Sequence, residues 1–129
     1  MDIVIGTTYK QEWTVTEDML AKNMKSGAVS VFATPMMIAL LESAASDCLQ
    51  QFLDEGVISV GASISTSHIA ATPLGMKVWA IAEITGVEGR RVDFKVTAYD
   101  EVEKIGEGVH SRVFLDKQRF EQKALGKMK

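Results

Sequence analysis

The feature that most constrains the fold is a long apolar segment, residues 35–55, followed by a series of alternating segments. At about 100° per residue, the apolar side chains of this segment form a wide stripe along a helix. Thr34 suits an N-cap, Pro35 suits the first helical position, and Gly56 is a natural stop. From Val57 onward, apolar and polar residues alternate with the period of two that is typical of strands. An apolar helix and a sheet with one apolar face can bury each other, so the sequence predicts an α+β fold with an antiparallel sheet wrapped around a long central helix.

Short turns join the predicted strands, which requires antiparallel pairing because a parallel pair needs a long crossover. In the strand that begins at Val57, the even-numbered positions are apolar up to Ile64 and are expected to face the helix. The strand around Phe94 alternates most regularly, with its apolar residues on the expected inner face. The predicted strands lie at residues 10–15, 57–68, around 78–84, 91–99 and 105–115.

Length and composition limit the class of protein. The 129 residues, 47% of them hydrophobic, suffice for one core, so we expect residues 1–129 to form a single domain with a basic tail at about 117–129. No transmembrane run or signal peptide is evident. The net charge of −3 argues against nucleic acid as the main partner. A lone Cys48 cannot form a disulfide within the chain, which agrees with a cytoplasmic location. The basic tail is interpreted as a solvated segment in preference to a phosphate-binding one.

One carboxylate, Glu42, lies within the apolar run of the predicted helix. On a helical projection it falls roughly 130° from the polar side chains of the same helix. A carboxylate that faces a core must be paired, hydrogen-bonded or protonated. Burying it as an unpaired charge costs on the order of several kcal/mol or more, which is comparable to the free energy of unfolding of a whole domain. Glu42 is therefore a candidate either for a structural lock or for catalysis.

His68 has the even parity of the strand that begins at Val57, so it is expected to point at the helix. With an inward Glu42 it would form an acid–base pair. Thr34 is expected to act mainly as a helix cap. It precedes Glu42 by eight residues, about 12 Å along a helix axis, so a bridging His68 or a partner chain would be needed to join the two.

Other chemistries are weakly supported. The sequence has no GxSxG, HExxH or CxxC motif and neither a Walker loop nor GxGxxG, which argues against α/β-hydrolases, zinc enzymes and nucleotide-binding folds of those classes. With two histidines and one cysteine, no metal site is expected.

The order of these features resembles the hotdog fold, in which an antiparallel sheet wraps a long helix. More narrowly, the chain resembles the fluoroacetyl-coenzyme A thioesterase-like family. The resemblance is carried by Ala33-Thr34-Pro35, by Glu42 within the helix and by His68. The strands from 76 to 116 continue it, and it covers about residues 4–116.

This resemblance implies an acyl-CoA thioesterase that hydrolyses a small acyl-CoA thioester to the free acid and coenzyme A. It implies Thr34, Glu42 and His68 as catalytic residues. By position, it also implies that Gly61 offers a backbone N–H to the thioester carbonyl and that Arg112 lies near the site. No cofactor is implied, because coenzyme A is part of the substrate. No residues that would select a fluorinated acyl group can be carried over.

Two mechanisms are open at this point. Either Glu42 attacks the carbonyl or activates water while Thr34 or His68 moves protons, or Thr34 attacks with His68 as its base.

Two other functions are also open. The chain could be a hydratase–dehydratase of the hotdog class, or a non-catalytic acyl-CoA-binding module in which Glu42 is only structural.

The expected partners are the acyl-CoA and a second copy of the chain, with neither nucleic acid nor membrane involved. Trp79 and Ile81 lie on the second face of their strand, which predicts that this face is covered in a homodimer or in a tetramer built from it.

Overall fold

The computed structural model describes residues 2–128. Its strands and longer helices are β1 (Thr8–Thr14), α1 (Thr34–Gln50), β2 (Val57–His68), β3 (Lys77–Glu88), β4 (Arg91–Asp100), β5 (Lys104–Asp116) and α2 (Lys117–Leu125). Three short 3-10 turns are η1 (Glu17–Met19), η2 (Ala21–Asn23) and η3 (Gly126–Met128). Within residues 2–128, no helix has the length and apolar character needed to cross a membrane.

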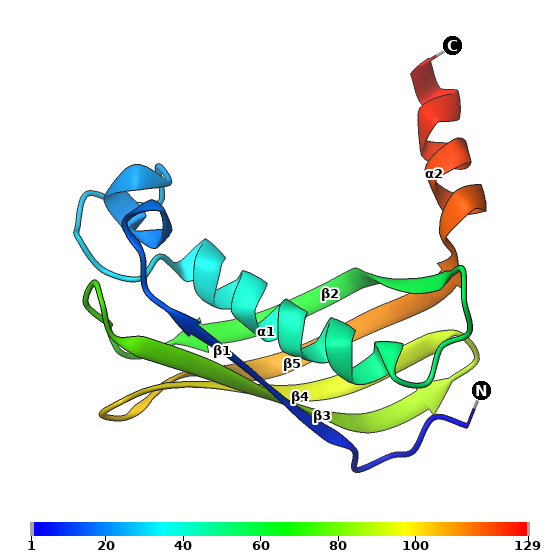
Figure 1. The fold of residues 1–129 in the computed structure, drawn as a ribbon, viewed down its shortest axis with the longest axis horizontal. Helices are drawn as coiled ribbons and strands as arrows, with labels where there is room; N and C mark the ends of the chain where they lie inside the picture. Colours follow the sequence, from blue (N-terminus) through cyan, green and yellow to red (C-terminus); the bar gives the residue numbers. More distant parts are fainter. Residues whose placement is uncertain (1, 129) are drawn as a thin grey trace.

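The five strands form one antiparallel sheet in the order β1-β3-β4-β5-β2. The helix α1 lies across one face of the sheet, and α2 projects from the end of β5 (Figure 1). The predicted α+β arrangement, a long helix against an antiparallel sheet, is therefore confirmed. The strands β1 and β2 form the two edges of the sheet.

The core lies between α1 and the inner face of the sheet. Leu40, Leu41 and Leu49 of α1 are fully buried, and Phe94 of β4 is 1% exposed. The whole predicted inner face of β4 is buried with Phe94, namely Val92, Val96 and Ala98. Each such large apolar side chain contributes roughly 1.5–3 kcal/mol when it leaves water, so this interface holds α1 in place.

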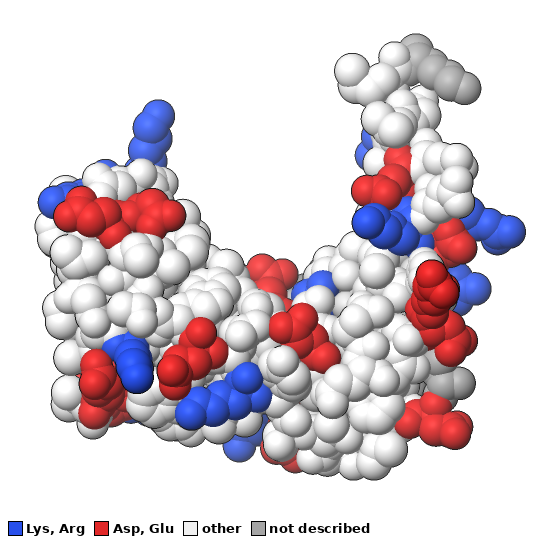
Figure 2. All heavy atoms as spheres, viewed as in Figure 1, with Lys and Arg blue, Asp and Glu red and all other residues white. Residues whose placement is uncertain are grey.

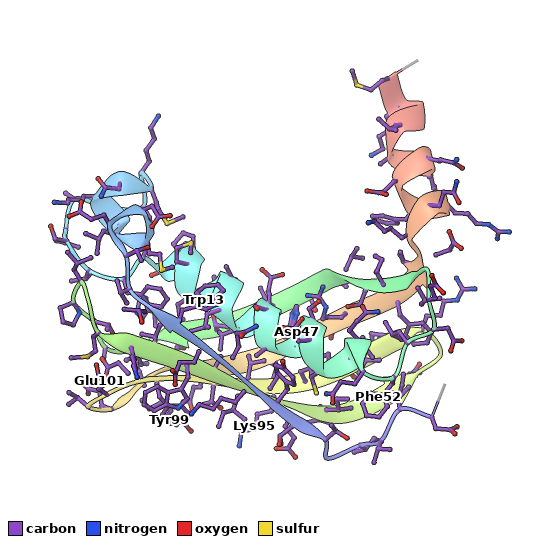
Figure 3. The ribbon with its side chains drawn as sticks, in the orientation of Figure 1. Trp13, Asp47, Phe52, Lys95, Tyr99 and Glu101 are labelled. Atoms are coloured by element: carbon purple, nitrogen blue, oxygen red, sulfur yellow. The ribbon has the colours of Figure 1, made fainter. Side chains whose placement is uncertain are left out.

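The outer face of the sheet is covered in part by its own side chains. Trp79 of β3 stacks on Tyr99 of β4 with their ring centroids 6.0 Å apart, and Lys10 Nζ lies 5.2 Å from the centroid of the Trp79 ring. Tyr99 and Lys95 lie on the side of the sheet away from α1 (Figure 3). Trp79 and Ile81 are half-buried within the single chain, so by themselves they do not require a second one.

The strand β2 contains a bulge that exchanges its two faces. Its register against β5 shifts between Gly61 and Ser63. Before the shift, the buried residue is Ser59, whereas after it Ile64 packs against the core. An extra residue in a period-two strand turns every later side chain to the opposite face. The prediction that the even positions face the helix is therefore wrong at Val60 and correct at Ile64.

The bounds of α1 also differ from those predicted. The helix starts at Thr34 and ends at Gln50, five residues before the predicted end at Glu55. Its N-cap is Ala33, which makes no side-chain cap bond, so Thr34 is not the cap. The chain then turns through Gly56, whose φ of +84° is the left-handed conformation that glycine adopts freely.

The basic tail of the sequence forms the helix α2. The Asp116 side chain caps this helix by accepting a hydrogen bond from the Arg119 backbone N–H at 2.9 Å. Every residue of α2 is exposed, and the helix stands away from the rest of the chain with basic and acidic side chains around it (Figure 2).

Candidate active site

A hydrogen bond joins Thr34 to His68. Thr34 is the first residue of α1 and His68 is the last residue of β2, and Thr34 Oγ1 lies 2.8 Å from His68 Nδ1. Because Ala33 caps the helix, the Thr34 hydroxyl is free for this contact. The pair is the arrangement expected of a hydroxyl and the base that exchanges a proton with it.

The other ring nitrogen of His68, Nε2, has no hydrogen-bond partner among residues 2–128. This atom is also buried. Burial lowers the pKa of His68, and an interaction with the Ala70 backbone opposes this shift. The imidazole is therefore neutral near pH 7 and able to accept a proton. Thr34 and His68 line a hollow of about 300 Å³ together with Val29, Phe32 and neighbouring residues.

A second group of residues lies further along α1, around Glu42. Gly61 of β2 is opposite Arg112 of β5 in the sheet, and Glu42 Oε2 lies 3.9 Å from Arg112 Nη1. A Cβ added to Gly61 would come within 2.7 Å of Glu42 Oε2, so only glycine lets the carboxylate lie this close to the strand. The structure thus brings together Glu42, Gly61 and Arg112.

The environment of Glu42 differs from the predicted one. Its side chain is 40% exposed, so it lies at the margin of the core. Its ionic partner is Arg112, and no hydrogen bond or ion pair joins it to His68 within residues 2–128. The predicted acid–base pair of Glu42 and His68 within one chain is therefore wrong. The bulge in β2 is the physical reason, because it lets Gly61 face Glu42 before the strand reaches His68.

Arg112 is held by hydrogen bonds to Ser59 and His110, two residues that the sequence did not identify as its partners. Its Nε donates to Ser59 Oγ at 2.8 Å and its Nη2 donates to the Ser59 carbonyl at 3.0 Å. Its Nη1 lies 3.3 Å from His110 Nε2, and His110 Nδ1 lies 2.7 Å from the Ser63 carbonyl. Donation from Nδ1 to that carbonyl would leave Nε2 as the acceptor for Arg112.

Burial also sets the charge states of this group. Desolvation lowers the pKa of Arg112, and the charge of Glu42 opposes that shift. Desolvation likewise lowers the pKa of His110, with the Ser63 carbonyl opposing it and the charge of Arg112 adding to it. A neutral His110 beside a charged Arg112 is the consequence. In the sequence, His110 stood out only as one of the two histidines, and nothing there linked it to Arg112.

The two groups are separate within one chain. Thr34 and Glu42 are eight residues apart on α1, about 12 Å along the axis. Glu42, Gly61 and His110 line their own small hollow of about 170 Å³ against β2. Within residues 2–128, no cluster of three or more His, Cys, Asp or Glu side chains is placed to hold a metal ion.

Comparisons with known proteins identify the family of this chain. Residues 15–118 match the model of the family described as fluoroacetyl-CoA-specific thioesterase. The fluoroacetyl-CoA thioesterase of Streptantibioticus cattleyicolor is 41% identical over 93 residues, which are 72% of this chain and 67% of that protein.

Solved structures show that proteins of this kind have the same fold as this chain. A solved structure of the fluoroacetyl-CoA thioesterase superposes with a TM-score of 0.92 at 32% identity, covering 98% of both chains. A Thermus thermophilus member of the thioesterase superfamily has a TM-score of 0.87 at 32% identity, covering 98% of this chain and 93% of its own. The predicted hotdog-type architecture is confirmed by this likeness.

Proposed function

Because this chain belongs to the family of fluoroacetyl-CoA-specific thioesterases and is a thioester hydrolase, we propose that it hydrolyses small acyl-CoA thioesters with Thr34, Glu42 and His68 as catalytic residues. The observation that carries the assignment of residues is the 2.8 Å contact between Thr34 Oγ1 and His68 Nδ1. Glu42 beside Gly61 supplies the second half of the site.

The proposed chemistry follows from what each group offers. Either the Glu42 carboxylate attacks the thioester carbon to form an acyl–Glu42 anhydride, which water then hydrolyses, or it takes a proton from a water that attacks the carbon directly. The backbone N–H of Gly61 stabilises the developing oxyanion, an effect of about 3 kcal/mol per donor. The C–S bond then breaks to release the thiolate of coenzyme A, and the neutral Thr34–His68 pair relays to it a proton from the water consumed in the reaction. Arg112, fixed on Ser59 and His110, keeps the Glu42 side chain against the strand.

We also propose a homodimer, formed by the edge strand β2. This strand has 12 residues, and its outer edge pairs with no other strand among residues 2–128. A long exposed edge of this kind is a template for pairing with another chain. Two copies of β2 paired antiparallel would bring the His68 end of one beside the Gly61 half of the other. The Thr34–His68 pair of one chain would then complete the Glu42 half-site of its partner.

The dimer is expected to give a scattering mass twice the 14.1 kDa of the chain at micromolar concentration. Ser65→Lys adds a like charge to both copies of the exposed β2 edge, so this variant should dissociate and lose activity together. Thr14→Lys adds the same charge to the exposed part of the other edge strand, β1, and should stay dimeric. A monomeric wild-type protein in multi-angle light scattering would refute both the dimer and the shared site.

A thiol-release screen tests the activity itself. The purified protein is given acetyl-, fluoroacetyl-, branched, aromatic and longer acyl-CoAs, and free coenzyme A is followed with a thiol reagent. We expect release that is fastest for a small acyl group and unchanged by EDTA, since no metal or cofactor is proposed. Hydration of an enoyl-CoA without thiol release would favour the hydratase–dehydratase class. Binding of acyl-CoA with no turnover of any substrate would favour the binding module.

A cytoplasmic location is part of the same proposal. The lone Cys48 is fully buried in the core, and burial raises the pKa of its thiol to about 11. Such a thiol stays protonated and needs no oxidising compartment. Cell fractionation that recovers the protein outside the cytoplasm would contradict this location.

A further inference from the structure

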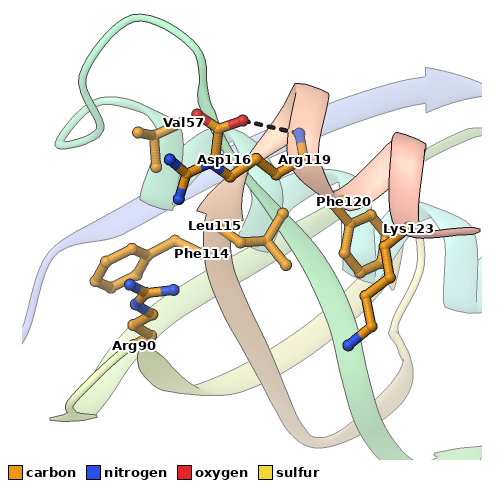
Figure 4. Close-up of a pocket in the computed structure, with 8 residues that line it drawn as sticks. All are labelled: Val57, Arg90, Phe114, Leu115, Asp116, Arg119, Phe120 and Lys123. Carbon is orange, nitrogen blue, oxygen red and sulfur yellow. Dashed lines mark hydrogen bonds between the residues drawn. The ribbon is translucent and has the colours of Figure 1, made fainter.

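A cavity lies between α2, the start of β2 and the end of β5, and neither half of the proposed catalytic site uses it. We call it the α2 cavity; its volume is about 350 Å³ (Figure 4). Two aromatic rings line it, those of Phe114 and Phe120. Three cationic side chains line it as well, Arg90 from the β3–β4 turn and Arg119 and Lys123 from α2.

The charge of the α2 cavity is positive although the chain as a whole carries −3. Its one acidic lining residue, Asp116, is occupied as the cap of α2. Within residues 2–128, Arg90, Arg119 and Lys123 have no carboxylate within salt-bridge distance. Three cations without internal partners around one hollow attract an anion, and guanidinium and ammonium groups together suit phosphate.

The aromatic lining narrows the class of anion. Phe120 is 43% exposed, and it faces the cavity from a helix that makes little contact with the rest of the chain. Phe114 is half-buried and borders both the cavity and the core. Aromatic faces next to cations bind bases by stacking while the cations hold the phosphates. A phosphorylated nucleoside satisfies both kinds of lining, whereas inorganic phosphate would leave the rings without a partner.

We propose that the α2 cavity binds the phosphorylated adenosine end of coenzyme A. This inference rests on the proposed function, since it assigns a subsite for the same substrate. Phe114 and Phe120 hold the adenine, and Arg90, Arg119 and Lys123 hold the phosphates. The helix α2, which the sequence indicated to be only a solvated tail, then serves as a nucleotide clamp beyond the sheet.

The position of the α2 cavity along β5 suits this role. Arg112 marks the catalytic end, opposite Gly61, and Asp116 marks the cavity end, opposite Val57. The two ends are four residues apart, about 14 Å at the rise of an antiparallel strand. The pantetheine arm contains two amide units, so it is comparable in length to four extended residues. A thioester at Gly61 can therefore place its nucleotide in the cavity.

The test removes two cations of the cavity without touching the catalytic residues. For Arg119→Gln/Lys123→Gln we expect KM for acyl-CoA to rise about tenfold, with kcat within about twofold of wild type. The matching acyl-pantetheine, which lacks the nucleotide, should show no change in KM. Lys77→Gln/Lys95→Gln removes the same charge from exposed positions on β3 and β4 outside the cavity and should leave both KM values unchanged.

A binding measurement separates this proposal from the proposed activity. Titration calorimetry with adenosine 3′,5′-bisphosphate should show binding to the wild type that weakens about tenfold in Arg119→Gln/Lys123→Gln. Inorganic phosphate and adenosine, each given alone, should bind much more weakly than the bisphosphate. Binding of the bisphosphate without hydrolysis of any acyl-CoA would support the cavity and reject the activity. Equal KM values for the wild type and the double variant, or an equal rise with acyl-pantetheine, would overturn the cavity assignment.

Discussion

Glu42→Gln is expected to lower kcat about a thousandfold while the protein stays folded. The amide keeps the size of the side chain and its place between Gly61 and Arg112, but it is neither a nucleophile nor a base at neutral pH. Stability should change little, because the Glu42 side chain is 40% exposed and lies 3.9 Å from Arg112. The buried Arg112 guanidinium stays hydrogen-bonded to Ser59 in this variant, and an ion pair with one exposed partner contributes about 1 kcal/mol.

Asp47→Asn is the matched control for this variant. Asp47 is an exposed carboxylate of the same helix, and it accepts a hydrogen bond from Gln11 Nε2 at 2.9 Å on the side of β1. Its neutralisation should leave kcat within about twofold of the wild-type value. The two variants are compared by thiol release and by thermal unfolding under the same conditions. A Glu42→Gln protein that keeps near wild-type kcat would remove Glu42 from the mechanism and leave the route in which Thr34 attacks.

The residual rate of Glu42→Gln also distinguishes a structural role from a chemical one. If Glu42 only anchored Arg112, the variant would lose activity in proportion to its unfolded fraction, and a lowered melting temperature would accompany the loss. A folded, inactive protein is the result that a catalytic carboxylate gives.

The sequence predicted the layers of this fold because their signals are local. The alternation around Phe94 and the apolar run through Leu40 and Leu41 each follow from the period of one element, and both are buried as expected. The end of α1 was less well predicted, since no local signal stops the helix at Gln50 before Gly56. Tertiary packing, which a propensity does not contain, sets such a boundary.

The arrangement of the site could be predicted only in part. Thr34, Glu42 and His68 were identified as candidates, but their pairing depends on one bulge in β2 that no residue pattern announced. Without the bulge, a strict period of two would turn Gly61 away from Glu42. Ser59 was likewise invisible as a partner of Arg112, because an isolated serine in an alternating strand looks like a solvent-facing residue.

His68→Ala and Thr34→Val should each lower kcat by about 10²- to 10⁴-fold, and the double variant should be no slower than the worse single one. This non-additivity is expected because the two side chains act as one unit through the 2.8 Å contact between Thr34 Oγ1 and His68 Nδ1. Folding should survive His68→Ala, since Nε2 is buried without a partner and its removal relieves that cost. Multiplicative losses would mean that Thr34 and His68 work independently.

The pH dependence of the rate provides the sharpest test of His68. Burial lowers its pKa below the ordinary value of about 6.5, so the ring is neutral at pH 7 and becomes protonated only as the pH falls through that lowered pKa. We therefore expect kcat/KM to fall on the acidic side with an apparent pKa below about 6.5. Stability should decline over the same window, from about pH 6.5 downward, because the unfolded chain binds protons there that the folded chain does not.

His110, whose pKa burial also lowers, contributes to that loss of stability, so stability alone does not identify His68. The fall of kcat/KM on the acidic side does identify His68, if the rate is measured on the folded fraction of the protein at each pH. In His68→Ala the residual rate should lose the limb that this imidazole produces, while the loss of stability from His110 persists. If the limb is unchanged in His68→Ala, the titrating group is another one, and His68 is not the residue that moves the proton.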